Sequence, residues 1–324
     1  MNRPNRRHRP LKPRKKEGTR SIRTHAHPSS RLKSKVGKKS LSRARIGLLK
    51  NKSKGEALND VEKKMLDHEM AIAQELQANL LPRRIPKLPG YELNAYYRPS
   101  QEVGGDYYDF IPIDENHIAI LVADVAGKGI PGSIVMTETR ALFKSEAKRS
   151  LSTQETLLRV NRTLHEDIKR GMFVTVFYMI LNIPRMVLQV TSAGHNPMVL
   201  WRQKTKTCHL VNTNGLALGI DRGSLFEKTL EEKRLQLRKG DRFVLYTDGV
   251  VEAMNSNSDI YGDERFHRQT AKTANLTSSE YISLLVKDLE SFQSEAPQSD
   301  DITIVTGRCL PDSMENDETF LAEA

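Results

Sequence analysis

The sequence predicts an α+β protein, because strand-like runs occur close together and are interrupted by pairs of helical segments. Three strands are expected in close order at residues 91–98, 107–113 and 117–123. The links between them have hairpin length, which favours antiparallel pairing over a parallel βαβ arrangement. Two helices, at residues 131–148 and 152–169, follow before the next strands begin.

The third expected strand, 117–123, is an unbroken apolar run, which is typical of a strand buried on both faces. It ends at Asp124, just before a turn that contains Gly127 and Gly129. Glycines let the backbone approach another group closely, and Pro131 suits the first turn of the helix that follows. The strand therefore delivers a carboxylate to a tight turn at its own end.

The second half of the chain repeats the pattern of strands followed by a helix pair. Apolar or β-branched runs predict strands, and amphipathic segments predict helices. The expected strands are 173–182, 186–192, 197–202, 208–211, 241–247 and 302–307, and the expected helices are 263–271 and 278–291. Strand 241–247 again runs into an acid, Asp248, while the helix at 152–169 opens on a capping box formed by Ser152 and Glu155.

Charge is distributed unevenly over the 324 residues, whose net charge is +11. Residues 1–55 hold 20 lysines and arginines but one acid, whereas the remainder holds 31 basic and 39 acidic residues. Residues 1–55 also lack Phe, Trp and Tyr, and this composition predicts a disordered basic tail. It is either simply solvated or attaches non-specifically to nucleic acid or an anionic surface.

Residues 56–81 show a helical stripe of apolar residues that ends at Pro82. We expect this amphipathic helix to pack on the following domain, in preference to the alternative of a homodimer through helix 56–81. No apolar run reaches the roughly 18 residues that a transmembrane helix needs. The two cysteines, Cys208 and Cys309, form no ligand pattern, which favours a cytoplasmic location.

Four acidic turns are the candidate functional residues. They are Gly104-Gly105-Asp106, Ala123-Asp124-Val125, Thr247-Asp248-Gly249 and Ser299-Asp300-Asp301. Carboxylates about 4 Å apart repel each other by roughly 4 kcal/mol at an effective dielectric of 20, so a cluster of them either shares protons or requires cations. Oxygen ligands without His or Cys select Mg²⁺ or Mn²⁺. Two such ions would activate water for direct attack on a phosphate ester.

Each motif alone has an ordinary interpretation. Asp248-Gly249 is typical of a turn. The Gly127-Lys128-Gly129 segment lacks the residues of a phosphate-binding P-loop. His195 suits a turn in which it bonds its own backbone. The order and spacing of the motifs are more informative than any one motif.

Together with Ala193-Gly194-His195-Asn196-Pro197, these motifs resemble the PPM-type metal-dependent serine/threonine protein phosphatases, in their bacterial SpoIIE-like (RsbU-like) branch. The resemblance covers residues 72–308. It implies an αββα sandwich of two antiparallel sheets flanked by helix pairs. The expected domains are the basic tail 1–55, a linker helix 56–82, the phosphatase domain 83–309 and an acidic C-terminal tail 310–324.

The resemblance also implies roles for individual residues. Asp124 would bridge two Mn²⁺ or Mg²⁺ ions, with the Val125 carbonyl oxygen on one of them, and Asp106 would be the acidic ligand of the second ion. Asp124 and Asp106 are thus the expected catalytic residues. Asp248 and Asp300 would bind the first ion, although Asp301 could take or share the last role. Asp109 is a weaker candidate, for contact with water on a metal.

The phosphate-holding arginine of better-known members of this family is not found at its usual place, which is occupied by Gln101-Glu102-Val103. Arg98 or Lys128 could replace it. The implied substrate is phosphoserine or phosphothreonine on a regulatory protein of the anti-anti-sigma type in a partner-switching pathway. Two alternatives remain: an inactive phosphatase-like scaffold that acts through its basic tail, and a nucleotide cyclase, suggested by Gly104-Gly105-Asp106.

Overall fold

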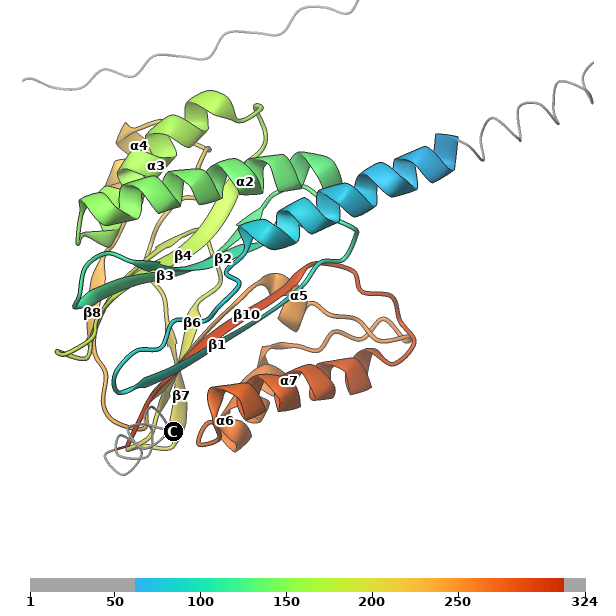
Figure 1. Ribbon diagram of the computed structural model, residues 1–324. Helices are drawn as coiled ribbons and strands as arrows, with labels where there is room; N and C mark the ends of the chain where they lie inside the picture. The colour runs from blue at the N-terminus through green and yellow to red at the C-terminus, as the bar shows by residue number, and fades with distance from the viewer. Residues whose placement is uncertain (1–61, 312–324) are drawn as a thin grey trace, which may run out of the picture. The chain divides into compact units, whose positions relative to one another are not determined.

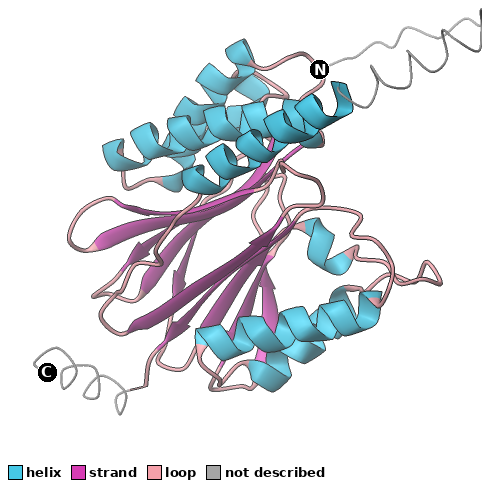
Figure 2. Cartoon of the chain, turned by 45° about the vertical axis from the view of Figure 1, so that its right-hand side comes forward, coloured by secondary structure: helices cyan, strands magenta, loops and turns pink. Residues whose placement is uncertain are grey.

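The computed structural model describes residues 62–311. The predicted basic tail 1–55, the start of the linker helix and most of the acidic C-terminal tail lie outside the described residues. The described part is built in four layers, with a helix layer on the outer face of each of two stacked sheets (Figures 1 and 2). The predicted αββα sandwich is therefore confirmed.

The first sheet has the strand order β1-β10-β9-β6-β7. Its strands are all antiparallel to their neighbours, as the hairpin-length links predicted. They span β1 (Tyr91–Arg98), β10 (Ile302–Cys309), β9 (Arg242–Tyr246), β6 (Met198–Arg202) and β7 (Thr207–Val211). Because β1 pairs with the last strand, the two ends of the domain are joined in one sheet.

The second sheet has the order β2-β3-β4-β5-β8 and is also antiparallel throughout. Its strands are β2 (Tyr107–Pro112), β3 (His117–Val125), β4 (Val174–Asn182), β5 (Val187–Ala193) and β8 (Lys233–Gln236). In the register, Tyr107 lies opposite Ala123 and Pro112 opposite Ile118. The first residues of β2 and the last residues of β3 therefore lie at the same end of the sheet, and the hairpin that connects the two strands lies at the opposite end.

Helix pairs cover the outer faces of both sheets. The second sheet carries α2 (Gly129–Glu146) and α3 (Thr153–Asp167), joined by the short 3₁₀ helix Ala147–Arg149, and the first carries α6 (Asp263–Thr273) and α7 (Ser278–Gln293). Two short helices, α4 (Ser224–Thr229) and α5 (Asp248–Val251), and the edge strand β8 were not predicted from the sequence. Of the capping box, only the Ser152 side-chain bond to the Glu155 amide forms, since Glu155 itself turns to Ser150 and Arg159.

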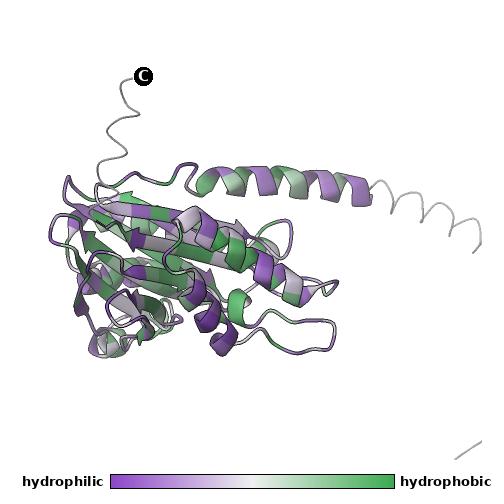
Figure 3. Ribbon diagram, turned by 90° about the horizontal axis from the view of Figure 1, so that it is seen from below, coloured by the Kyte–Doolittle hydropathy of each residue, from purple (hydrophilic) through white to green (hydrophobic). Residues whose placement is uncertain are grey.

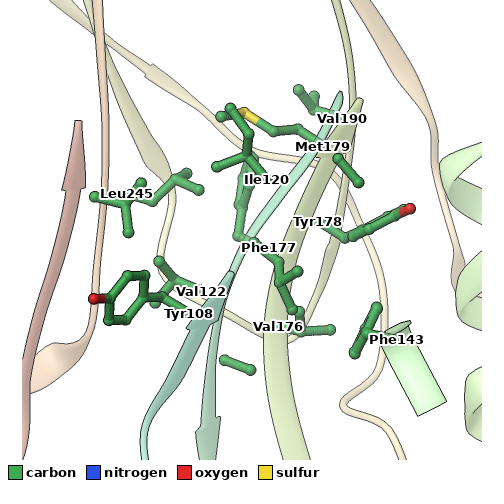
Figure 4. Close-up of a cluster of buried hydrophobic side chains, with 14 of the residues drawn as sticks. Tyr108, Ile120, Val122, Phe143, Val176, Phe177, Tyr178, Met179, Val190 and Leu245 are labelled. Carbon is green, nitrogen blue, oxygen red and sulfur yellow. The ribbon is translucent and has the colours of Figure 1, made fainter. Parts of the chain in front are cut away.

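Apolar side chains fill the space between the two sheets and beneath the helices. Leu245 of β9 faces Ile120 and Val122 of β3 across the sandwich, whereas Tyr178 of β4 points to Phe143 of α2 (Figure 4). The latter two rings lie 5.3 Å apart, and both side chains are fully buried. Burial of a large apolar side chain contributes about 1.5–3 kcal/mol, so this double-faced packing explains the unbroken apolar runs of the central strands.

Helix 62–80 departs from the prediction. We expected its apolar stripe to pack on the domain, but Met65, Leu66, Ile72 and Leu76 are between 45% and 62% exposed. Figure 3 shows apolar and polar residues interspersed along it. Only its end is anchored, by the buried side chain of Gln77, by Leu81, and by Arg140, which donates to the Leu80 carbonyl. The favoured packing interpretation was therefore wrong for most of the helix.

No helix within residues 62–311 is both long and apolar enough to cross a membrane.

Candidate metal-dependent active site

The acidic turns gather at the edge of the sandwich where β3 ends. Asp124 is the penultimate residue of β3, and the apolar run before it is completely buried. Asp248 is the first residue of α5, directly after β9, and Asp300 lies in the loop that leads into β10. The charges of Asp248 and Asp300 both raise the pKa of Asp124, as expected of carboxyl groups that lie near one another.

Burial and mutual repulsion both act on the pKa values of these acids. Burial, followed by the charges of Asp248, Asp300 and Asp301, raises the pKa of Asp124 from 3.8 to about 7. Burial and the neighbouring charges of Glu252 and Asp300 also raise the pKa of Asp248. Carboxyl groups held in this way release their protons most readily when a cation is present.

Asp106 is buried at the start of β2 and is held by two threonines. The hydroxyl groups of Thr247 and Thr303 donate to its Oδ2 atom over 2.7 Å and 2.6 Å. Burial, together with the charges of Asp124 and Asp301, nevertheless raises its pKa well above the usual range. The two hydroxyl groups fix the orientation of Asp106 and leave its other oxygen, Oδ1, for a further partner.

Asp301 accepts backbone amides from a distant part of the chain through both of its carboxylate oxygens. Its Oδ1 accepts from the Ser100 amide at 2.7 Å, and its Oδ2 accepts from the Gly105 and Asp106 amides at 2.7 Å and 3.3 Å. Because a carboxylate satisfied by several N–H groups is fully occupied, Asp301 acts as a clamp that joins the loop before β10 to the turn before β2. Asp300 is more exposed: within the described residues, its Oδ1 accepts only the neighbouring Asp301 amide, at 2.9 Å, and its Oδ2 lies 2.9 Å from the Lys128 ammonium.

Two glycines make this gathering of turns sterically feasible. A Cβ atom at Gly105 would lie 3.1 Å from the carbonyl oxygens of both Val125 and Gly127. A Cβ atom at Gly249 would overlap the carbonyl oxygen of Asp301. These positions need glycine because backbone carbonyls pass directly in front of them. The Val125 carbonyl oxygen thus faces the Asp106 turn.

Other side chains singled out in the sequence lie away from the acids. Asp109 is buried under α2, where Lys144 pairs with it at 2.6 Å and the Tyr107 hydroxyl donates to it at 2.5 Å. It is a structural ion pair, so a role in contact with metal-bound water is not supported. Arg98 pairs with Glu290 and Gln293 of α7.

The turn motif suggested that His195 bonds its own backbone. In the structure, its ring instead contacts Thr175 and Tyr246. Its Nδ1 atom lies 2.9 Å from the Thr175 hydroxyl, and its Nε2 atom lies 3.1 Å from the Tyr246 carbonyl oxygen. A carbonyl can only accept, so Nε2 carries the proton and Nδ1 accepts from Thr175. Burial lowers the pKa of His195 to about 4, so the neutral ring joins the two sheets beside the acids.

Gln77 was not recognised as a site residue from the sequence. Its amide group makes two bonds to Gly104, donating to the carbonyl at 2.8 Å and accepting from the amide at 2.9 Å. Helix 62–80 is thus fastened to the turn that carries Asp106. A polar residue at a helical position gives no signal of this contact, because its partner lies 27 residues away.

The donor set suits hard divalent cations, although it is not a preformed cage. Within residues 62–311, no three His, Cys, Asp or Glu side chains are arranged as a ready-made metal site. The oxygens that face this edge are carboxylates and the Val125 carbonyl, which are the ligands that Mg²⁺ and Mn²⁺ prefer. The neighbouring negative charges, which add to the effect of burial in raising the pKa of Asp124, are what a bound cation would offset. The residues therefore fit the predicted metals.

Two cavities of the described part of the chain lie away from the acid cluster. Cavities of about 710 and 790 Å³ are lined by His117 and Asn116 among others, and these residues lie at the opposite end of the β2–β3 hairpin. We assign the candidate site to the acids, because the acidic turns converge there and not at either cavity.

Two stacked antiparallel sheets between helix pairs, with an acid cluster at one edge, define the class of PPM-type phosphatase domains. The chain belongs to the SpoIIE family, since the family model described as Stage II sporulation protein E (SpoIIE) matches residues 114–309. This confirms the resemblance drawn from the motifs.

Individual relatives agree with this assignment. The chain is 32% identical over 189 residues to the phosphoserine phosphatase RsbU of Bacillus subtilis, covering 58% of this chain and 55% of RsbU. It is 28% identical over 188 residues to the phosphoserine phosphatase RsbP of the same organism, covering 57% of this chain and 45% of RsbP. The chain thus spans about half the length of the curated relatives it matches.

The fold is also found among solved structures. The SiaA PP2C domain of Pseudomonas aeruginosa superposes with a TM-score of 0.67 at 22% sequence identity, and the match covers 76% of this chain and 98% of that one.

Proposed function

We propose that this protein is a metal-dependent serine/threonine protein phosphatase whose active site is the acid cluster at the end of β3. The observation that carries the proposal is the convergence of Asp124, Asp248 and Asp300, whose mutual repulsion calls for cations. Membership of the SpoIIE family and similarity to two phosphoserine phosphatases support it.

The proposed metal ligands are Asp124, Asp106, Asp248, Asp300 and the Val125 carbonyl oxygen. We favour Asp300 over Asp301, because both oxygens of Asp301 already accept backbone amides. When bound, a pair of Mn²⁺ or Mg²⁺ ions would lower the pKa of water and neutralise the charge of the phosphate. The protein itself holds the carboxylates in place through Thr247, Thr303 and the Asp301 clamp.

The proposed reaction is hydrolysis of a phosphoserine or phosphothreonine ester. A bond forms between phosphorus and the oxygen of water, the bond from phosphorus to the side-chain oxygen breaks, and the freed hydroxyl leaves with a proton. The proposed substrate is a phosphorylated regulatory protein of the anti-anti-sigma type. This is supported by similarity to RsbU and RsbP, which are named phosphoserine phosphatases.

Further proposals concern segments beside the catalytic edge. We propose that residues 1–55 recruit or localise the enzyme and take no part in hydrolysis, and that helix 62–80 contacts a second copy of the chain. The exposed side chains of Met65, Ile72 and Leu76 support the second proposal. Cross-linking of a cysteine placed at residue 72 tests it, and a monomer at all concentrations would contradict it.

The test of the phosphatase proposal is Mn²⁺-dependent release of phosphate from a phosphoserine peptide by the full-length protein. Asp124→Asn should abolish this activity, because it removes the central carboxylate and leaves the fold intact. Asp114→Asn is the matched control, since it makes the same charge change in the hairpin at the opposite end of β3. If wild-type protein releases no phosphate with any divalent ion, the alternative of an inactive scaffold is favoured.

A further inference from the structure

Lys128 reaches from the turn after β3 to the loop before β10. It is the N-cap residue of α2, and its side chain is 51% exposed. Its Nζ atom lies 2.9 Å from the Asp300 Oδ2 atom and donates to the Ser299 carbonyl oxygen at 2.7 Å. These contacts join positions 171 residues apart in the sequence, and they place an ammonium group directly on the acid cluster.

The charge of Lys128 acts on more than one acid of the cluster. It opposes the rise in pKa of both Asp124 and Asp248, while the carboxylates in turn raise the pKa of Lys128 itself. Two other basic side chains described above are paired with other acids: Arg98 with Glu290 and Lys144 with Asp109. Among the described residues, Lys128 is therefore the basic side chain that partly balances these acids.

We propose that Lys128 is an exchangeable counter-ion of the acid cluster, which releases Asp300 when a divalent cation binds there and then holds the phosphate group of the substrate. The proposal deepens the proposed function, on which its second half rests. It also resolves the choice between Arg98 and Lys128, because Arg98 is paired on α7, away from the acids.

Physical reasons support an exchange. A divalent ion interacts more strongly with Asp300 than a single ammonium does, since the Coulomb energy scales with charge. The lysine stem is flexible and about half exposed, so the ammonium can swing from the carboxylate to a neighbouring anion without disturbing the core. Once the metals neutralise the acids, the nearest strong anion is the phosphate, which lysine binds as a point charge.

The first test measures Mn²⁺ affinity without substrate, by electron paramagnetic resonance titration of the full-length protein. Lys128→Met should bind Mn²⁺ more tightly, by roughly 3- to 10-fold, because the competing charge at Asp300 is removed. The gain should shrink at high salt. Lys148→Met, an equal charge change at an exposed residue of the 3₁₀ helix at the far end of α2, should stay within about twofold of wild type.

The second test measures binding of inorganic phosphate to the Mn²⁺-saturated protein by calorimetry. Lys128→Met should weaken phosphate binding by roughly 10- to 100-fold, the loss typical of one charge-assisted bond, and Lys128→Arg should retain most of it. With a phosphoserine peptide as substrate, Lys128→Met should raise KM by a similar factor and change kcat much less.

Two results would overturn the proposal: unchanged or weaker Mn²⁺ binding by Lys128→Met, or phosphate affinity equal to that of wild type. A wild-type protein that binds Mn²⁺ and phosphate but hydrolyses no phosphoserine peptide would instead refute the phosphatase proposal. In that case the two binding measurements still decide the role of Lys128.

Discussion

Replacing Asp124 by asparagine should stabilise the metal-free protein at pH 8 and, at the same time, remove its stabilisation by Mn²⁺. In the folded protein the pKa of Asp124 is raised to about 7 by burial and by the charges of Asp248, Asp300 and Asp301. In the unfolded chain the same carboxyl group ionises near 3.8. The ionised group is therefore disfavoured by folding, and asparagine retains its shape without its charge.

The pH dependence follows from these two values. Between about pH 4 and pH 7 the folded protein retains a proton that the unfolded chain has released, so the free energy of unfolding falls as the pH rises through this range. At about 1.36 kcal/mol for each pKa unit, ionised Asp124 destabilises the metal-free fold by up to about 4 kcal/mol above pH 7. The neutral amide should recover part of this free energy, whereas at pH 4 it should recover almost none.

The assay is urea unfolding in EDTA at pH 5 and pH 8, repeated at pH 8 with saturating MnCl₂. Wild type should be less stable at pH 8 than at pH 5, and Asp124→Asn should narrow that difference. Mn²⁺ should raise the unfolding midpoint of wild type only. Asp114→Asn should behave as wild type with respect to Mn²⁺. If Asp124→Asn is no more stable than wild type in EDTA at pH 8, the acids do not repel each other as inferred.

Two further predictions concern the support of the site and the basic arm. Thr303→Val removes the 2.6 Å hydrogen bond to Asp106. This should lower the free energy of unfolding by about 1.5–3 kcal/mol, measured by urea unfolding, and weaken Mn²⁺ binding, measured by titration. Thr137→Val, on the exposed face of α2, is the control and should change neither quantity. Deletion of residues 1–55 should leave hydrolysis of a small aryl phosphate largely intact, and loss of that activity would refute the proposed division of labour.

The order and type of the main elements could be predicted from local sequence patterns. Apolar runs and β-branched residues located the strands, and the prediction for β1 matches Tyr91–Arg98 at both ends. The elements that were missed are short or charged: α5 has four residues, and β8 is the largely exposed segment Lys233–Gln236. Elements of this kind give too little periodicity to be recognised, because long-range contacts stabilise them more than their own residues do.

The part of the candidate site that could be predicted also depends on local sequence patterns. Asp124 and Asp248 follow buried strands, so an acid at a strand end could be read from the sequence. Nothing local distinguishes Asp300 from its neighbour Asp301. Only the fold shows that Asp301 accepts the amides of Gly105 and Ser100, which lie 196 and 201 residues away in the chain, and thereby joins two loops.

Local patterns were enough to predict the α+β class, the antiparallel strands and the acids at the ends of β3 and β9, because strand burial and turn chemistry act over a few residues. The tertiary structure alone decided that Asp109 pairs with Lys144, that Lys128 and not Arg98 reaches the acids, and that helix 62–80 leaves its apolar residues exposed. The physical reason is that a charged or amphipathic side chain takes whichever partner the fold brings within a few ångströms, and that partner is distant in the chain.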